Sequence, residues 1–343
     1  MRVQVTGIEG VSEGWKQYLS TCPAACIYHD ERWKEVIEKT FGHHCHYLAA
    51  ISNGRVRGVL PLVEMRSALF GHFMVSLPFV TYGGLAADDD DARSALTAAA
   101  IRLAQQTKSG YIELRQRADA ALSWACRKHK VALVVNLPTA AEQAWAALSS
   151  RLRGKVRKAQ RSGAAFQALG PEAAAEFYRV FARNMRDVGT PVYPLDFFRN
   201  IGRTFSEETY IFLVRQAGNT VAAAFGLRDC ERLQLPWICS DYRYTRNYFN
   251  EFLYWSVIEW ACGRGFRQVD LGRSTAGGGN HRFKKQWNPQ EIILPWYYWT
   301  ADGSGPPQLN PDNPRFSLPI RLWRRLPLAV TNLLGPRIVR SIP

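Results

Sequence analysis

A glycine-rich segment followed by basic and aromatic residues is the part of the chain best suited to chemistry. It reads Leu-Gly-Arg-Ser-Thr-Ala-Gly-Gly-Gly-Asn-His-Arg-Phe-Lys-Lys-Gln-Trp over residues 271–287. Consecutive glycines let a backbone approach a ligand closely and expose its amide N–H groups. The cations that could bind a phosphate or a developing oxyanion are Arg273, Arg282, Lys284 and Lys285. Ser274, Thr275, Phe283 and Trp287 would complete a substrate site, but a flexible loop beside a solvated run of charge fits the same residues.

Two further segments carry polar and aromatic side chains that could bind a substrate. One covers residues 184–194, between two expected helices, and the other runs from Trp237 to Trp255. Their candidate substrate-binding residues are Asn184, Arg186, Tyr193, Trp237, Asn250 and Tyr254. Ordinary helix capping and turn chemistry would also explain the first segment. A packed core would equally explain the aromatic residues of the second.

A strongly basic stretch on an expected helix indicates an anionic partner. Its cations are Arg153, Lys155, Arg157, Lys158 and Arg161. The chain as a whole has a formal net charge of +15. This surface could contact the backbone of RNA, such as tRNA, or a nucleotide or lipid diphosphate. A solvated helix face is the alternative, since net charge alone bears on solubility and non-specific binding.

Several common kinds of site are missing from the sequence. His43, His44, Cys45 and His46 have the types of metal ligands, but consecutive residues of a strand point in opposite directions, so we expect no metal site. Seven scattered cysteines without a CxxC pair indicate reduced thiols in the cytosol. There is no Walker loop, dinucleotide fingerprint or Gly-x-Ser-x-Gly elbow. We therefore expect a cytoplasmic protein with no tightly bound cofactor, no signal peptide and no membrane span.

A weak internal repeat organises the chain into two similar halves. The first half has expected strands at residues 47–51, 56–64 and 75–79, a helix at 92–106 and a strand at 111–114. The second half repeats this order with strands at 210–215, 221–227 and 233–238, a helix at 248–263 and a strand at 266–271. A strand that follows a helix implies a crossover into a mixed sheet, so we expect an α/β fold with two tandem subdomains. Two unrelated α+β domains are the alternative.

The expected subdomains cover residues 1–138 and 139–300, and the second carries the candidate active site. Residues 301–343 are expected to be a Pro/Gly-rich linker and a basic amphipathic tail. The tail has no acidic residue from Arg315 onward, and its arginines include Arg321, Arg324, Arg325, Arg337 and Arg340. Such a segment can lie on an anionic membrane surface, here the inner face of the inner membrane, or pack back on the second subdomain.

The sequence resembles FemAB-like proteins associated with exosortase (PEP-CTERM) and exopolysaccharide systems of Gram-negative bacteria, nearly from end to end. The elements that carry the resemblance are His29 with Trp33, Phe41-Gly-His43, Gly58-Val-Leu-Pro-Leu62, Ser76-Leu-Pro-Phe79, Tyr82-Gly-Gly84, residues 184–194, Asn250 to Trp255, Gly272-Arg-Ser-Thr275, Phe283-Lys-Lys-Gln-Trp287 and residues 333–340. The resemblance implies two tandem GNAT-like subdomains, each a mixed sheet flanked by helices. The loop at residues 276–281 departs from the pattern. Arg243-Tyr-Thr-Arg-Asn-Tyr248 stands where many acetyl-CoA-dependent GNATs have a glycine-rich pyrophosphate turn.

FemAB proteins transfer an aminoacyl group from charged tRNA to an amine of a peptidoglycan precursor. Phe283-Lys284 is similar to the Phe-Lys pair at their reaction centre. The resemblance thus implies an acyltransferase or aminoacyltransferase acting on an amine or hydroxyl of a cell-envelope, exopolysaccharide or peptide precursor. We hypothesise that Lys284 stabilises the oxyanion, that Arg273 helps bind anionic groups, and that Asp270 orients or deprotonates the nucleophile. Proton transfer by the substrate itself is the alternative to Asp270 as the base. The donor, aminoacyl-tRNA or acyl-CoA, would be a co-substrate. An acyl-CoA-dependent GNAT N-acyltransferase and a non-catalytic adaptor of envelope biogenesis are the alternatives.

Overall fold

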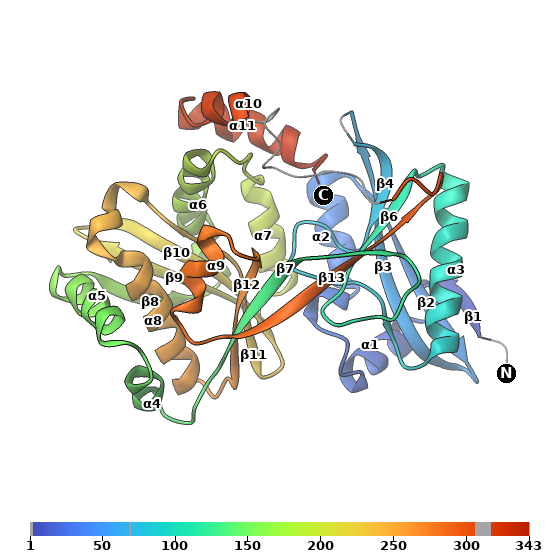
Figure 1. Ribbon diagram of the computed structural model, residues 1–343, viewed down its shortest axis with the longest axis horizontal. Helices are drawn as coiled ribbons and strands as arrows, with labels where there is room; N and C mark the ends of the chain where they lie inside the picture. Colours follow the sequence, from blue (N-terminus) through green and yellow to red (C-terminus); the bar gives the residue numbers. More distant parts are fainter. Residues whose placement is uncertain (1–2, 69, 306–316, 343) are drawn as a thin grey trace. The chain divides into compact units, whose positions relative to one another are not determined.

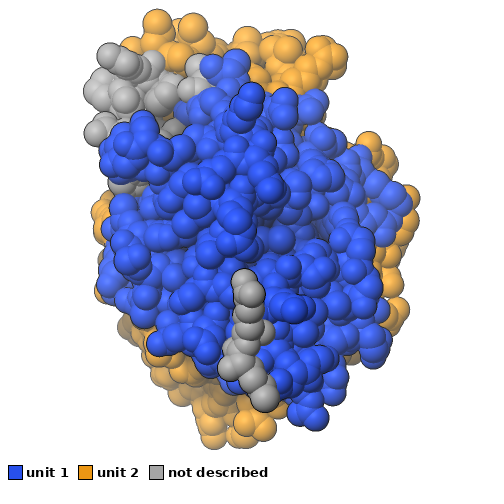
Figure 2. Space-filling view, turned by 90° about the vertical axis from the view of Figure 1, so that its right-hand side faces the viewer, with its two compact units in different colours: residues 1–131, 292–309, 340–343 blue, residues 132–291, 310–339 orange. Residues whose placement is uncertain are grey.

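The protein consists of two compact units, each made from more than one stretch of the sequence. The computed structural model describes residues 3–68, 70–305 and 317–342 (Figure 1). Unit 1 comprises residues 1–131, 292–309 and 340–343, and unit 2 comprises residues 132–291 and 310–339 (Figure 2). Each unit has β-strands in a mixed sheet with helices packed on it, which confirms the predicted α/β fold class.

Unit 1 is built on strands in the order β1-β2-β3-β4-β6-β13. These strands are β1 (Gln4–Gly7), β2 (His44–Ser52), β3 (Arg55–Ser67), β4 (Gly71–Val75), β6 (Tyr111–Arg115) and residues 292–300 of β13 (Gln290–Thr300), with the short β5 (Ala86–Ala87) paired to β3. Neighbours are antiparallel except β4 and β6, which are parallel. The parallel pair requires the crossover that we predicted.

Helices cover both faces of the unit 1 sheet. They are α1 (Ser12–Thr21), the 3₁₀ turn η1 (Ile27–His29), α2 (Arg32–Phe41) and α3 (Asp90–Thr107). Trp15 of α1 stacks on Tyr47 of β2, with ring centroids 5.6 Å apart. Leu96 of α3 belongs to the same core cluster as Ala50 of β2. Since alternate strand residues face opposite sides, α1 and α3 lie on opposite faces of the sheet (Figure 1).

The third strand of the first half is β4 at Gly71–Val75, so the strand predicted at residues 75–79 is wrong. Beyond Val75 the chain turns sharply. Leu77 has φ of 32° and Phe79 has φ of 72°, and both values lie outside the β region. Apolar side chains suggested a strand here, but backbone geometry that local composition does not reveal places these residues in a buried turn. The helix and the last strand of this half are confirmed as α3 and β6.

Strand β13 explains why the units are discontinuous. It pairs antiparallel with β6, placing Trp296 opposite Arg115 and Thr300 opposite Tyr111. Residues 292–300 therefore complete the unit 1 sheet, although we predicted that they belong to the second subdomain. Residues 301–305 also go with unit 1, and residues 317–339 go with unit 2. Most of the predicted Pro/Gly-rich linker, at residues 306–316, lies outside the described residues. Local periodicity predicts a strand but does not specify its distant partner. A division of the sequence into consecutive domains therefore misses the pairing of β13 with β6 in unit 1.

Unit 2 has strands in the order β7-β12-β11-β10-β9-β8. These are residues 132–136 of β7 (Ala125–Asn136), β8 (Ala165–Leu169), β9 (Thr209–Gln216), β10 (Asn219–Asp229), β11 (Arg232–Ser240) and β12 (Gln268–Thr275). Strands β8 to β11 are antiparallel, whereas β11 and β12 are parallel and are joined through α8 (Phe249–Gly263). This confirms the order hairpin, strand, helix, strand predicted for the second half.

Unit 2 contains further helices besides α8. They are α4 (Ala141–Ala146), α5 (Ser150–Arg161), η2 (Pro171–Ala173), α6 (Ala174–Val188), α7 (Leu195–Thr204), η3 (Tyr242–Asn247), α9 (Gly279–Lys285), α10 (Ser317–Trp323) and α11 (Leu328–Val339). Phe177 of α6 packs on Phe225 of β10, whereas Trp260 of α8 packs on Phe212 of β9. In the described parts of the chain, no helix combines the length and apolar character needed to span a bilayer.

Candidate active site

The glycine-rich segment forms a tight turn followed by a short helix. Strand β12 ends at Thr275, and α9 begins at Gly279. The Gly278 N–H donates to Thr275 O at 3.0 Å, and the Gly277 N–H donates to His281 Nδ1 at 3.0 Å. Two of the three consecutive glycines thus use their amides within the turn. The predicted cradle of exposed glycine amides is therefore wrong, because local hydrogen bonds satisfy most of its donors.

Lys284 is the most unusual titratable residue of this segment. Its side chain is buried, and Nζ donates to Gly272 O at 3.1 Å and to Arg273 O at 3.2 Å. Burial lowers the pKa of the Lys284 ammonium to about 8, against the opposing effect of the Asp270 carboxylate. Buried lysines are rare unless they are paired with a charge or serve a function. The amine is therefore a strong candidate for a reactive group.

Asp270 and Gly272 shape the backbone that holds Lys284. Asp270 is buried, and its Oδ1 accepts the Gly272 N–H at 2.8 Å. Gly272 has φ of 75°, and a Cβ at this position would lie 2.8 Å from Leu235 O. Only glycine fits both the left-handed backbone and the close approach. This local geometry aims the carbonyls of residues 272 and 273 at the lysine.

The two carbonyls that Lys284 contacts belong to Gly272 and Arg273 of β12. They lie just beyond the last residue of β12 that is paired with the parallel strand β11. The register joins Arg232 to Gln268 and ends with Gln234 opposite Asp270. Both strands continue, β11 to Ser240 and β12 to Thr275, without further register pairs. Ser274 lies on this part of β12, and its buried Oγ has no hydrogen-bond partner among the described residues.

The aromatic residues around Lys284 pack against one another. The Tyr254 ring stacks on Trp287 with centroids 5.6 Å apart and meets Phe283 edge-on at 5.1 Å. Tyr254 and Trp287 are buried, whereas Phe283 is partly exposed. Tyr254 and Trp287 therefore act as core residues that support α9 rather than as open stacking surfaces. Phe283 keeps the exposure that contact with a substrate requires.

The residues predicted at 184–193 mainly hold unit 2 together. Asn184 Nδ2 donates to Ser240 O at 2.9 Å, which ties α6 to the end of β11. Arg186 pairs with Asp187 at 2.6 Å. Tyr193 lies in an aromatic cluster with Phe181 and Trp237, and Trp237 itself is buried. These contacts agree with the alternative stated for this segment, in which its polar residues serve local structure and not a substrate.

Two other predicted binding residues keep partial exposure. Asn250, in the first turn of α8, and Arg273, on β12, are each partly exposed. Thr275 at the end of β12 is exposed. Their side chains are thus accessible in a way that those of Trp237 and Tyr254 are not.

The predicted basic helix exists as α5, and part of its charge is used internally. Arg153 Nη1 donates to Leu148 O at 2.8 Å and to Ala146 O at 3.0 Å, satisfying carbonyls near the end of α4. Lys155 pairs at 3.0 Å with Glu251, which is buried. Arg157, Lys158 and Arg161 remain exposed, although Lys158 lies 5.1 Å above the Tyr248 ring. The available cationic surface is thus smaller than the sequence indicated.

No group of three or more His, Cys, Asp and Glu side chains within the described residues is arranged to hold a metal ion. Two histidines of the run at residues 43–46 make other contacts. His43 Nε2 donates to Arg340 O at 2.7 Å, and His46 faces Glu64 across the hairpin at 3.4 Å.

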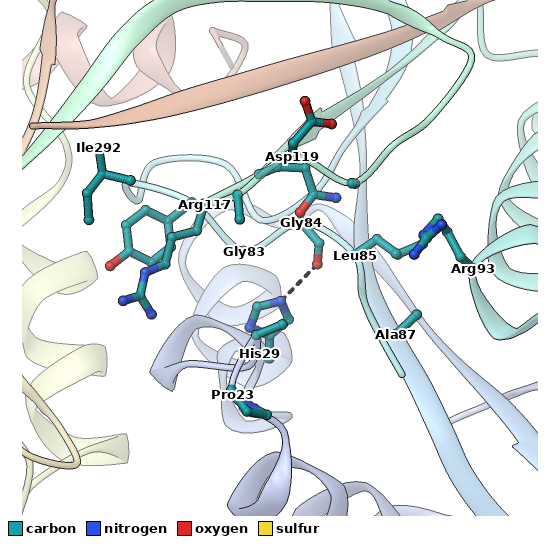
Figure 3. Close-up of a pocket in the computed structure, with 15 residues that line it drawn as sticks. Pro23, His29, Gly83, Gly84, Leu85, Ala87, Arg93, Arg117, Asp119 and Ile292 are labelled. Atoms are coloured by element: carbon teal, nitrogen blue, oxygen red, sulfur yellow. Dashed lines mark hydrogen bonds between the residues drawn. The ribbon is translucent and has the colours of Figure 1, made fainter. Parts of the chain in front are cut away.

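A cavity in unit 1 was not predicted. Its volume is about 330 Å³, and Figure 3 shows His29, Gly83, Gly84, Arg93 and Arg117 in its lining. His29 Nδ1 accepts the Cys26 N–H at 3.2 Å, so Nε2 carries the proton and donates to Gly84 O at 2.9 Å. The lining comes from four separate segments between residues 23 and 292. Only Tyr82-Gly-Gly84 and His29 stood out in the sequence, as elements of the resemblance.

The segment that carries Lys284 is similar to a known family of protein domains. Residues 146–285 match the family model described as acetyltransferase (GNAT) domain. This match includes β12 and nearly all of α9. No curated protein matches the chain in sequence.

Solved structures share the fold over most of the chain. FemX matches with a TM-score of 0.67 and 13% identity, covering 85% of this chain and 96% of FemX. L-PGS from Bacillus licheniformis matches at 0.54 and 12%, covering 95% of this chain and 97% of that protein. A tandem GNAT protein from the clavulanic acid biosynthesis pathway matches at 0.54 and 11%, covering 89% and 100%. Residues 146–285 are thus similar to the acetyltransferase (GNAT) domain, and the fold of the chain is similar to that of FemX and of a tandem GNAT protein.

Proposed function

We propose that this protein transfers an acyl or aminoacyl group directly to an amine or hydroxyl acceptor, with Lys284 at the reacting carbonyl. The observation that carries this proposal is the buried Lys284 amine, which two backbone carbonyls of β12 hold within the GNAT-type domain. A structural lysine would gain nothing from losing its hydration, whereas a catalytic one gains electrostatic strength in a dry site.

The geometry of Lys284 suits stabilisation of an oxyanion. An ammonium has three N–H donors, and Gly272 O and Arg273 O accept from two directions. The third donor is then free to bind the carbonyl oxygen of the donor ester or thioester. As the acceptor attacks the carbonyl carbon, negative charge builds on that oxygen, and the ammonium stabilises it. The tetrahedral intermediate collapses by expelling the donor's hydroxyl or thiol, and the proton of the nucleophile passes to that leaving group or to a base.

Asp270 supports this arrangement as a positioning residue. One of its oxygens holds the Gly272 N–H, so the carboxylate fixes the backbone that binds the lysine. Its negative charge also favours the protonated form of Lys284. Deprotonation of the nucleophile by Asp270 stays a prediction, as do contacts of Arg273, Ser274 and Thr275 with the substrate.

Two separate surfaces of unit 2 favour two different classes of acyl donor. Exposed cations on α5, at Arg157, Lys158 and Arg161, favour an aminoacyl-tRNA donor. The alternative, an acyl-CoA donor, is favoured by the N-terminus of α8, where Tyr248 has φ of 60° and no side chain caps the free amides. Such amides attract phosphate groups. We place the acceptor among cell-envelope, exopolysaccharide or peptide precursors, including those of exosortase systems, on the strength of the sequence resemblance.

A donor-binding panel tests the proposal first. Thermal unfolding is measured at fixed salt with CoA, acyl-CoAs, and charged and uncharged tRNA. A donor at a hundred times its Kd should stabilise the native state by about 2.7 kcal/mol. A salt-sensitive shift with charged tRNA alone identifies aminoacyl transfer, and a shift with acyl-CoA alone identifies the alternative.

Turnover of the donor so identified is then measured with hydroxylamine as a surrogate acceptor. Lys284→Met should lower turnover at least tenfold, whereas Lys285→Met, at the exposed neighbouring position, should leave it within about twofold. Equal rates for the two variants would remove Lys284 from the mechanism. If no donor binds or turns over, the non-catalytic adaptor becomes the better description.

A further inference from the structure

The two C-terminal helices of unit 2 display large apolar side chains to solvent. Seven large apolar residues are exposed in the described parts of the chain, and five of them lie on α10 and α11. They are Leu318, Leu322, Leu333, Leu334 and Ile338. Leu333 is 63% exposed, although a leucine on a packed helix normally turns toward the core. Apolar exposure concentrated in one place marks an interaction surface.

The helices are held so that their leucines cannot turn inward. Thr331, Gly335 and Val339, spaced by four, form the buried face of α11. A Cβ on Gly335 would lie 2.9 Å from Val192 N, so the helix lies close against the backbone. In this orientation a threonine and a glycine face the protein, while Leu333 and Leu334 face water.

Helix α10 is fixed in a similar way. The Arg324 guanidinium donates to Val188 O at 3.1 Å. A Cβ on Gly189 would lie 2.5 Å from Ile320 Cγ2, which places Ile320 directly over the end of α6. Leu318 and Leu322, one turn apart, are left on the exposed side.

The charged side chains of α10 and α11 themselves have a single sign. Arg321, Arg325 and Arg337 are exposed, and none of them forms an ion pair within the described residues. No acidic residue occurs from residue 315 to the last residue printed. A protein partner of mixed charge would leave these cations unmatched, whereas a surface of uniform negative charge would match all of them.

We propose that α10 and α11 dock this protein on an anionic lipid bilayer. The docking face consists of Leu318, Leu322, Leu333, Leu334 and Ile338 with Arg321, Arg325 and Arg337. The aliphatic side chains would enter the boundary between headgroups and acyl chains, and the arginines would bind lipid phosphates. Helices of seven and twelve residues are too short to cross a bilayer, which takes about 20 residues, so they would lie along its surface. The proposal is independent of the reaction at Lys284.

Flotation of the full-length protein with vesicles tests the proposal. One set of vesicles is pure phosphatidylcholine, and the other contains 30% phosphatidylglycerol. We expect binding to the anionic vesicles at 0.1 M salt, at least tenfold weaker binding to the neutral ones, and loss of binding at 0.5 M salt. Replacing Leu333 and Leu334 by serine should weaken binding at least tenfold. Both side chains are exposed, so the melting temperature should not change.

Matched controls separate docking from general effects. Ile293→Ser removes an aliphatic side chain that is 55% exposed on β13 and should leave binding unchanged. Replacing the three docking arginines by glutamine should weaken binding by about fivefold for each charge removed. The same change at Arg151, Arg161 and Arg246, which are exposed elsewhere, lowers the net charge equally and should have a much smaller effect.

Three results would overturn the proposal. One is the absence of binding to anionic vesicles at low salt. Another is equal loss of binding in the docking and control variants. The third is a concentration-dependent dimer that Leu333→Ser with Leu334→Ser abolishes, which would make a second copy of the chain the occupant of this face.

Discussion

Replacing Lys284 by methionine removes the charge of a buried amine while keeping an unbranched side chain of similar length. The wild-type ammonium has a pKa of about 8 in the folded protein, against the ordinary lysine value of 10.5, because burial disfavours the charged form. Each tenfold change in an acid dissociation constant is worth about 1.4 kcal/mol, so this difference corresponds to about 3 kcal/mol. Below pH 8 Lys284 is protonated in the folded wild type, so the full cost of burying its charge lowers the free energy of unfolding.

The pH dependence follows from which state binds the proton. Between pH 8 and 10.5 the unfolded chain keeps the Lys284 proton, whereas the folded protein has released it. The free energy of unfolding of the wild type therefore rises with pH in this window, by up to about 3 kcal/mol from this residue. Lys284→Met lacks this contribution. Its stability relative to the wild type should be greatest at pH 7 and should fall by about 3 kcal/mol toward pH 10.5.

Urea denaturation at half-unit steps from pH 7 to 10.5 measures this difference. Taking the variant against the wild type cancels the titration of tyrosines and cysteines, which is common to both proteins. Lys285→Met is the matched control, since Lys285 is 57% exposed and pairs with Glu291 at 2.8 Å. Parallel stability curves for Lys284→Met and the wild type would show that the amine titrates normally, and the reasoning for a desolvated catalytic lysine would fail.

Two other substitutions test the supporting structure by urea denaturation. Gly272→Ala should lower the free energy of unfolding by about 1–3 kcal/mol, because φ is 75° and the new Cβ would press on Leu235 O. Gly263→Ala, where the Cβ would meet open space, should have little effect, and equal results at the two sites would contradict the geometry. Arg115→Met should cost about 3–5 kcal/mol, since it leaves the Glu113 carboxylate, bound at 2.6 Å, buried without its cation. Adding Glu113→Leu should restore much of this stability, and a double variant no more stable than the single one would point to packing instead.

The sequence predicted the second half of the fold well because its signals are local. The strands predicted at residues 210–215 and 221–227 correspond to β9 and β10, and Ala217-Gly218 forms the turn between them with φ of 47° and 77°. The following helix and strand are equally clear from periodicity. In the first half, by contrast, the apolar run at residues 75–79 reads as a strand, but tertiary packing makes it a turn.

The candidate site was predictable only in part. Lys284 was found from its resemblance to a Phe-Lys pair, but its burial and its two carbonyl partners depend on the positive φ of Gly272 and on the path of β12. Tyr254 and Trp287 were expected to contact a substrate, and they pack on each other instead. Aromatic type alone does not distinguish a stacking surface from a core. The unit 1 cavity was missed because its walls come from segments that are far apart in the sequence.

The discontinuous units have a consequence for how this chain is made and divided. When residues up to 131 have left the ribosome, β6 still lacks the neighbour β13, which pairs with it through residues 296–300. An unpaired strand edge is a template for intermolecular β-pairing. A fragment that stops near residue 138 would keep this edge open and should aggregate. A fragment in which residues 292–300 are joined to the first 131 residues by a flexible linker would close the sheet, and is the better starting point for studying unit 1 in isolation.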